Sequence, residues 1–464
     1  MLVLDEKSKT PLYAQLYQQI KDDIVKGCVK AGTKLRSSRK ISQELHISRN
    51  TVELAYEQLH AEGFIVSKPR KGYFVEAGAE ETFQKSKTAP NTRTAAMEDV
   101  NQKVVYDFRP CALYLREAPF PQWQRLMNRC FHDFKEGVIR YGSSFGEWSL
   151  RTEIQRYISD YRNVHCKVDQ IMVGTGTQFC LGLVCPLLRE RGFSVAMEEP
   201  GDDQARMTLQ NNGIKISPIE VDKEGLNVRV LEGAEARAVY VTPSHQFPTG
   251  TVMPMTRRLE LVEWARRRDA LIIEDDDSCH FQYDTKPLPS LQSLCGDRVI
   301  YLGSFSEMLF PCIQASYMVM PDPYLQDLYQ RFENHTPLVP FLMQKTLELY
   351  IRGGHWESHV RKTRKHQKEK CASLVQALKS EFGNNICILG THAGFHLLVQ
   401  VKWPMNEAEL IHRACQAGVG VCPTSKYWIR PQNSAYGTVL LSFRGIPLEH
   451  IPRAVKLLRE AWLG

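Results

Sequence analysis

Residues 35–75 read LRSSRKISQELHISRNTVELAYEQLHAEGFIVSKPRKGYFV, and this stretch decides the fold of the first part of the chain. It predicts a short helix over SSRKISQEL and a longer one opened by Ser48 and ended by Gly63, because serine favours the position before a helix and glycine the end. The second helix carries apolar residues at helical spacing, namely Val52, Ala55, Tyr56 and Leu59. FIVS and YFV then alternate like two strands around the turn KPRKG, which indicates a β-hairpin.

The residues before this stretch add a further helix. Residues 11–26, PLYAQLYQQIKDDIVK, place Leu12, Leu16, Ile20 and Ile24 four positions apart, which predicts an amphipathic helix. Pro11 suits its first position and Gly27 its end. Three helices followed by a hairpin with a basic tip indicate a winged helix-turn-helix domain over residues 1–76.

Residues 11–75 resemble the GntR family of DNA-binding regulators. The quoted stretch follows the pattern L-P-S-S-R-x-L-A…S-R-x-T-V…A-x-x-x-L-x-x-x-G…G-x-x-V almost throughout. The departure is Arg36, which stands where the family has proline and adds a positive charge before the second helix. The resemblance implies a double-stranded DNA operator as partner.

The residue types in this domain suit such a partner. The third helix presents Arg49, Asn50 and Thr51 at its start, where arginine can read guanine and asparagine adenine in a major groove. Helix starts favour phosphate, and the basic hairpin tip suits phosphate or a minor groove. Any single charge here is as readily an ordinary solvated residue, so the prediction rests on the constellation. The candidate DNA-binding residues are Arg36, Ser38, Arg39, Ser48, Arg49, Asn50, Thr51, Lys68, Arg70, Lys71 and Gly72.

Composition bounds the class of protein. With 464 residues the chain is long enough for at least two domains, and 43% hydrophobic and 24% charged residues are typical of a globular protein. The apolar runs are too short for a transmembrane helix, and the N-terminus lacks a signal pattern. The 13 cysteines form no C-x-x-C pair, so no metal site is expected. The same cysteine pattern predicts a protein of the reducing cytoplasm. The net charge of +7 is mild.

Residues 77–105, EAGAEETFQKSKTAPNTRTAAMEDVNQKV, are polar and show almost no periodicity. This composition predicts a flexible linker. From residue 106 to 464 the chain alternates helical patterns with short apolar runs such as IMVG, FSVAM, RAVYVT, ALIIED and RVIYLG. Such alternation indicates an α/β domain with a mostly parallel sheet.

The order of several motifs in this second domain resembles the MocR/GabR family, whose C-terminal half looks like a fold-type I aminotransferase. The motifs are YDFRP at 106–110, YGSSFGEWSLR at 141–151, GTGTQ at 174–178, EEPGDD at 198–203, TPSHQFPTG at 242–250, IIEDDDSCHFQYD at 272–284 and AGFHLL at 393–398. The resemblance implies a large fold-type I domain that pairs as a homodimer. It also implies a transcription regulator in which this domain senses an effector or serves as a dimerisation scaffold.

Residues 301–317, YLGSFSEMLFPCIQASY, resemble the family segment that carries the lysine for pyridoxal phosphate (PLP), roughly G-T/S-F-S-K-x-L-x-P-x-x-R-x-x-Y. Glu307 stands where that lysine should be, and Gln314 where the arginine should be. A carboxylate cannot form a Schiff base with an aldehyde. Covalent PLP is therefore not expected, and no catalytic residue is assigned.

Three further positions bear on the same pocket. By the resemblance, Asp275 keeps the carboxylate that meets the cofactor's ring nitrogen, whereas Asp277 replaces a tyrosine and Asp202 an aromatic residue. Together with Glu307 they make four acids, and like charges a few ångströms apart repel by a few kcal/mol at intermediate dielectric. The candidate pocket residues are Gly176, Thr177, Asp202, His245, Asp275, Asp277, Ser304, Ser306, Glu307 and Gln314.

Buried carboxylates need protonation, a protein cation or a cationic guest. Because the motif segments supply no new lysine or arginine, the pattern favours a cationic effector such as a di- or polyamine, bound by Asp277 and Glu307 with Asp202 assisting.

Other interpretations stay open at this point. The pocket is equally explained as a vestige filled with water, or its acids as members of structural salt bridges. An enzyme interpretation requires a PLP-dependent aminotransferase that uses another lysine, with Lys286 and Lys345 nearest in sequence. A third interpretation is a regulator that holds PLP or pyridoxamine phosphate without a covalent bond.

Overall fold

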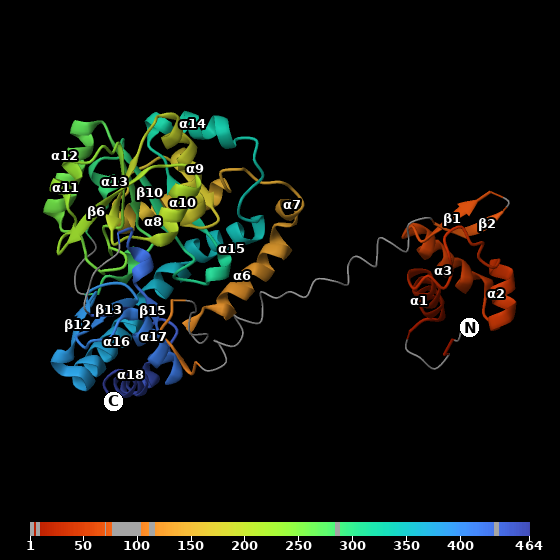
Figure 1. The fold of residues 1–464 in the computed structure, drawn as a ribbon. Helices are drawn as coiled ribbons and strands as arrows, with labels where there is room; N and C mark the ends of the chain where they lie inside the picture. The colour runs from red at the N-terminus through yellow and green to blue at the C-terminus, as the bar shows by residue number, and fades with distance from the viewer. Residues whose placement is uncertain are drawn as a thin grey trace. The chain divides into compact units, whose positions relative to one another are not determined.

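The structure is a computed structural model, and the chain divides into two compact units, Met1–Asp99 and Val100–Gly464 (Figure 1). The residues that it describes are 4–5, 10–69, 71–76, 104–110, 117–283, 288–430 and 436–464. Most of the predicted linker, residues 77–103, lies outside the described residues. Each unit is therefore described by itself.

The first unit is the winged helix-turn-helix expected from the sequence. Its elements are α1 (Leu12–Val25), α2 (Ser38–Leu45), α3 (Arg49–Ala61), β1 (Ile65–Lys68) and β2 (Gly72–Val75). The two strands pair antiparallel as the predicted hairpin. Ser37 caps α2 by accepting from the amide of Lys40, and Ser48 caps α3 by accepting from that of Thr51. These caps explain where both helices begin.

The apolar faces of the three helices close a core of their own. Leu16, Ile24, Val52 and Leu59 have no exposed surface, and Tyr56 is almost fully buried. Fully burying such a side chain contributes about 1.5–3 kcal/mol. The apolar residues that the sequence places at helical spacing thus face the core of this unit.

The second unit is built on an eight-stranded sheet in the order β4-β11-β10-β9-β8-β5-β6-β7. Its strands are β4 (Ile171–Gly174), β5 (Val195–Glu199), β6 (Ile216–Asp222), β7 (Gly225–Leu226), β8 (Ala238–Val241), β9 (Leu271–Asp275), β10 (Val299–Ser304) and β11 (Ser316–Val319). The neighbours from β10 to β6 pair parallel, whereas β11 and β7 run antiparallel to their neighbours. The expected mostly parallel α/β sheet is confirmed.

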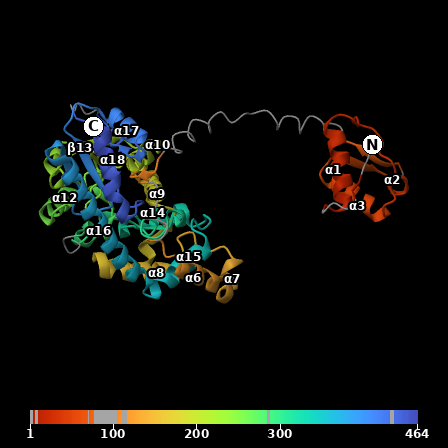
Figure 2. The same ribbon diagram turned by 90° about the horizontal axis from the view of Figure 1, so that it is seen from below.

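Helices cover both faces of this sheet (Figures 1 and 2). The helices of the second unit are α6 (Phe120–Asp133), α7 (Lys135–Val138), α8 (Trp148–Arg162), α9 (Thr177–Glu190), α10 (Asp203–Asn211), α11 (Val228–Glu232), α12 (Met255–Arg268), α13 (Leu291–Leu294), α14 (Asp322–Phe332), α15 (Phe341–Arg352), α16 (His355–Phe382), α17 (Glu407–Gln416) and α18 (Ile451–Leu463), of which α17 and α18 pack with the smaller C-terminal sheet. On β9, Leu271 and Ile273 join the core under α9 and α10, while Ile272 joins the core under α12. Strand β9 therefore buries both faces, as its unbroken apolar run requires.

The C-terminal part adds a smaller antiparallel sheet in the order β12-β13-β16-β15. Its strands are β12 (Ile386–Leu389), β13 (His396–Val401), β15 (Cys422–Pro423) and β16 (Thr438–Ser442), and β14 (Val419–Gly420) pairs parallel with β3 (Tyr106–Asp107). Short 3-10 helices are η2 (Val168–Gln170), η3 (Cys279–Phe281), η4 (Pro311–Ile313), η5 (Gly383–Asn385), η6 (Ser425–Tyr427) and η7 (Leu448–His450). None of the described helices combines the length and apolarity that crossing a membrane requires.

Candidate functional site

The start of α3 presents the polar residues predicted to meet DNA. Arg49 and Asn50 are exposed. The Nε of Arg49 lies 2.7 Å from an oxygen of Glu53, one turn further along α3. The same Glu53 oxygen accepts a hydrogen bond from the hydroxyl of Ser38 at 3.3 Å. Glu53, absent from the sequence-based prediction, thus ties the starts of α2 and α3 together.

The remaining predicted DNA-facing residues divide by role. Ser48 is engaged as the cap of α3, and its hydroxyl lies 2.8 Å from that of Thr51. Arg36 pairs with Glu44 at 2.5 Å. The side chains of Arg39, Lys68 and Lys71 are exposed. Gly72, at the turn of the hairpin, is exposed as well, and Arg70 lies outside the described residues.

In the second unit a cavity of about 380 Å³ opens at the carboxyl ends of five strands that run in one direction, β4, β5, β8, β9 and β10. In α/β sheets this edge is where ligands bind. All ten candidate pocket residues line the cavity, although they come from five segments spread over residues 176–314. Lys426, Tyr427 and Phe395 also line it. Phe395 belongs to the AGFHLL motif, whereas no motif in the sequence had marked Lys426 or Tyr427.

Four consecutive acids lie at the end of β9 and in the turn after it, and alternate ones face opposite sides because side chains alternate along an extended chain. Glu274 and Asp276 face a pair of buried arginines. Arg162 donates to Asp276 at 2.6 Å, and Arg258 lies 3.8 Å from Glu274. Asp275 and Asp277 line the cavity instead.

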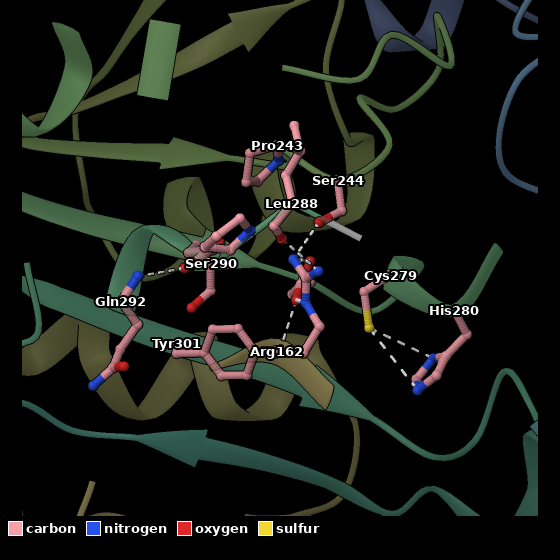
Figure 3. Close-up of polar contacts among 12 residues, drawn as sticks. Arg162, Pro243, Ser244, Cys279, His280, Leu288, Ser290, Gln292 and Tyr301 are labelled. Carbon is pink, nitrogen blue, oxygen red and sulfur yellow. Dashed lines mark hydrogen bonds and ion pairs between the residues drawn. The ribbon is translucent and has the colours of Figure 1, made fainter. Parts of the chain in front are cut away.

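The Arg162 contact fixes the orientation of this turn. Tyr301 also donates to Asp276, at 2.7 Å, and Arg162 donates further to the hydroxyl of Ser244 and the carbonyl of Leu288, each at 2.8 Å. Figure 3 shows Arg162 between Ser244, Leu288 and Tyr301. Since Asp276 is held in this network, Asp275 is the carboxylate left for the cavity.

The two pocket aspartates differ in their partners. Asp275 accepts from the hydroxyl of Tyr240 at 2.6 Å, and burial raises its pKa to about 6. Asp277 donates its backbone amide to Asp275, but its own buried Oδ1 has no hydrogen-bond partner among the described residues. Burial, then the charges of Glu307 and Asp275, hold the pKa of Asp277 well above its ordinary value.

Glu307 forms an ion pair with Arg444, which follows β16. The Arg444 side chain is only 8% exposed, and its guanidinium packs over the ring of Phe395. A protein cation therefore meets one of the pocket acids. The motif segments hold no such cation, but the fold brings one from 137 positions further along the chain.

Asp202 and its neighbours are also engaged. Asp202 caps α10 by accepting from the amides of Gln204 and Ala205 at 2.7 and 2.8 Å, and burial raises its pKa. Lys426 lies 3.1 Å from Asp203. The Asp202 carboxylate thus has a structural role in starting a helix.

One side of the cavity is formed by the start of α9 and the segment after β10. Gly176 precedes α9 at φ 99°, and no side chain caps the helix there. Ser304 accepts from the amide of Ser306, and Ser306 accepts from that of Ala315. Gln314 closes this side without a charge. Among the described lining residues, Lys426 is the single lysine or arginine.

His245 also lines the cavity. Burial, and then the neighbouring His396, hold its pKa well below the ordinary value, so the ring is neutral. Its Nε2 is buried and has no partner among the described residues.

Of the two alternative lysines the structure describes Lys345, which does not line this cavity. Lys345 pairs with Glu348 at 2.8 Å and lies over the ring of Phe134, away from the described lining residues. Lys286 lies outside the described residues.

The two units together define a class of protein, a DNA-binding domain of the winged helix-turn-helix type followed by an aminotransferase-like domain. Residues 12–75 match the bacterial regulatory proteins of the gntR family, and residues 113–430 match the aminotransferases of class I and II. Among solved structures, an archaeal alanine:glyoxylate aminotransferase superposes with a TM-score of 0.73 at 21% identity, over 79% of this chain and 92% of that one. At this identity the likeness shows the fold alone.

Two relatives cover nearly the whole chain. It is 37% identical over 454 residues to "Uncharacterized HTH-type transcriptional regulator YdeL" of Bacillus subtilis (strain 168), with 97% of each chain covered. It is 30% identical over 480 residues to the probable rhizopine catabolism regulatory protein MocR of Rhizobium meliloti, which covers 100% of this chain and 96% of the relative. The chain therefore belongs to the HTH-type transcriptional regulators that join a gntR-family domain to a class I and II aminotransferase domain.

Proposed function

We propose that this regulator uses its second unit as a sensory domain that binds a small molecule without catalysis and without covalent PLP. The observation that carries the proposal is the ion pair that the cavity residue Glu307 forms with Arg444. Glu307 follows β10 in the segment that resembles the cofactor-lysine segment. Its carboxylate faces a protein cation there and offers no amine to an aldehyde.

The residues of the cavity do not fit PLP. Its described lining holds five carboxylates, those of Asp202, Asp203, Asp275, Asp277 and Glu307. Against them stand Lys426 in the lining and Arg444, which pairs with Glu307 from beyond the lining residues. A phosphate dianion adds negative charge to this set, and like charges repel at these separations. The hydroxyls of Ser304 and Ser306 already accept from backbone amides nearby.

The effector proposed for this cavity is a cationic amine, and its first ligand is Asp277. Of the cavity acids, Asp202 starts α10, Asp203 meets Lys426, Asp275 meets Tyr240 and Glu307 meets Arg444. The buried Oδ1 of Asp277 has no partner among the described residues, and a buried polar atom without a partner is costly. An ammonium group donates hydrogen bonds and carries the compensating charge, with Glu307 as second ligand.

Two measurements test the absence of covalent cofactor. Purified protein mixed with PLP should show no visible absorbance band of a Schiff base. Borohydride reduction followed by peptide mass spectrometry should find no pyridoxyl adduct. An adduct on Lys426, the lysine that lines the cavity, would establish the enzyme alternative instead.

A thermal-shift screen tests the effector class. Putrescine, spermidine and monoamines should raise the unfolding temperature more than anionic metabolites such as succinate and PLP. Asp277→Asn should abolish the shift, and Glu307→Gln should reduce it. Stabilisation by the anions, or amine shifts unchanged in both variants, would rule out an amine site here. Titration calorimetry with PLP and with pyridoxamine phosphate tests the alternative interpretation, in which the regulator holds either compound without a covalent bond.

We further propose that the second unit pairs as a homodimer. Ile139 and Tyr141 are 83% and 91% exposed, and the nearby Trp148 and Phe131 are 55% and 50% exposed. Large apolar side chains left exposed within one short stretch of the chain suggest a protein interface. Two copies of the DNA-binding domain would then meet two half-sites.

A further inference from the structure

Helix α16, light blue in Figures 1 and 2, carries an exposed basic face. Residues 361–368 read RKTRKHQK and contain five lysines and arginines, one histidine and no acid. Arg361, Lys362, Lys365 and Lys368 are exposed. The opposite face is buried by Val360, Thr363, Gln367 and Cys371. At 100° per residue these two sets lie on opposite sides of the helix.

Three of the charges on this face have no acidic partner among the described residues. Among the described residues, no carboxylate lies within ion-pair distance of Arg361, Lys362 or Lys365. The nearest acids along the helix are Glu357, which is not within ion-pair distance of Arg361, and Glu369, which pairs with His366 instead. This face therefore combines a high density of positive charge with three members that meet no carboxylate among the described residues.

The basic end of α12 shows the contrast. Arg266, Arg267 and Arg268 are consecutive and exposed. Arg267 pairs with Glu232 and Glu263, Arg268 pairs with Glu232, and Arg266 donates to the carbonyl of Leu294. An equally basic stretch of the same unit is thus balanced within the fold. The α16 face lacks that balance at three positions.

We propose that this face of α16 contacts the phosphate backbone of duplex DNA outside the bases read by α3. A duplex is the polyanion that a gntR-family regulator binds in any case. From Arg361 to Lys368 the helix rises about 10 Å, and phosphates of one strand follow each other every 3.4 Å along the duplex axis, so the face matches about three phosphate steps. The contact is independent of base sequence.

Full-length protein and a 60-base-pair duplex of mixed sequence test the contact. The triple variant Arg361→Gln, Lys362→Gln, Lys365→Gln should flatten the slope of log affinity against log salt by about 2–3, since each phosphate contact contributes about 0.9. The matched control, Arg266→Gln with Arg267→Gln and Arg268→Gln, removes the same charge from α12 and should leave the slope within 0.5 of the parent, a margin of roughly half a contact. Equal slopes for parent and triple variant would overturn the proposal.

Lysine footprinting on the parent protein keeps the test independent of how the variants fold. The duplex should slow the acetylation of Lys362 and Lys365 severalfold, as it should for Lys71 of the wing. Lys223, exposed between Asp222 and Glu224, should react at an unchanged rate. Protection by poly-glutamate but not by DNA would assign the face to an acidic protein and overturn the proposal. So would no protection by either polymer.

Discussion

The acids around the cavity are not equivalent, because the fold gives each a different partner. Asp276 is neutralised by Arg162 and Glu307 by Arg444. Asp277 is left with a buried oxygen that no described residue meets. The sequence placed these residues in one pocket correctly. It could not pair them, since Arg444 lies far along the chain and only tertiary folding brings its guanidinium to Glu307.

That pairing decides what a reversion at position 307 would do. Glu307→Lys sets an ammonium against the nearly buried Arg444 guanidinium, so we expect no absorbance band with added PLP and a lower free energy of unfolding. Breaking a partly buried ion pair costs about 1–3 kcal/mol, less than a fully buried one. Glu307→Gln, which removes the charge without reversing it, should lose less. Denaturant unfolding and visible spectra of both variants check this. A Schiff-base band in Glu307→Lys would contradict it.

Asp277 makes the stability of the second unit depend on pH. Its pKa is raised in the folded chain, so the folded state holds the proton more tightly than the unfolded state. The resulting stabilisation is complete below the unfolded value of about 4 and is lost as pH rises through the folded pKa. Asp277→Asn cannot ionise. We expect it to raise the free energy of unfolding at pH 8 by about 1–3 kcal/mol and to change it little at pH 4.

Urea unfolding at pH 4, 6 and 8 measures this dependence. The matched control is Asp160→Asn, because Asp160 is an exposed carboxyl on α8 of the same unit. It should follow the parent at each pH. If Asp277→Asn and the parent lose stability in parallel between pH 4 and 8, the buried carboxyl is not the group that titrates.

At the scale of elements, the helices and hairpin of the first unit follow from local sequence. Ser37 and Ser48 cap α2 and α3, and the apolar spacing of α3 points into the core. In the second unit, apolar runs indicated strands but not their order. Strand β11 runs antiparallel between β4 and β10 and separates two strands distant in sequence. Such an order depends on long-range pairing, which no local pattern encodes.

The position of Arg49 at the start of α3 makes a specific prediction for DNA binding. Arg49→Ala should weaken binding to a duplex selected by the parent by about 1–3 kcal/mol and relax specificity at one base pair. Lys71→Ala should weaken all sequences alike and flatten the salt slope by about one. Selection from random duplexes, followed by titration, separates the two effects. If Arg49→Ala selects the same sequence as tightly as the parent, α3 does not read that base.

On the scale of the whole molecule, the two units have separate hydrophobic cores. The first is closed by residues from Leu4 to Val75, and those of the second begin at Tyr106. The change in composition at residues 77–105 marked this division in the sequence. The exposure of Ile139 and Tyr141 could not be predicted from the sequence, because the exposure of a side chain depends on how the surrounding helices pack.

This separation predicts how much each unit contributes to the affinity for DNA. A fragment of residues 1–76 should unfold cooperatively as a monomer, with modest stability because so small a core buries little surface. The full chain should sediment at twice its 53.2 kDa. Because a dimer engages two half-sites at a high effective concentration, the fragment should bind a duplex selected by the full chain about 10²–10⁴-fold more weakly. Analytical ultracentrifugation and fluorescence anisotropy measure both quantities. A full chain that sediments at 53 kDa, or a fragment that binds as tightly as the full chain, would show that the second unit does not pair the DNA-binding domains.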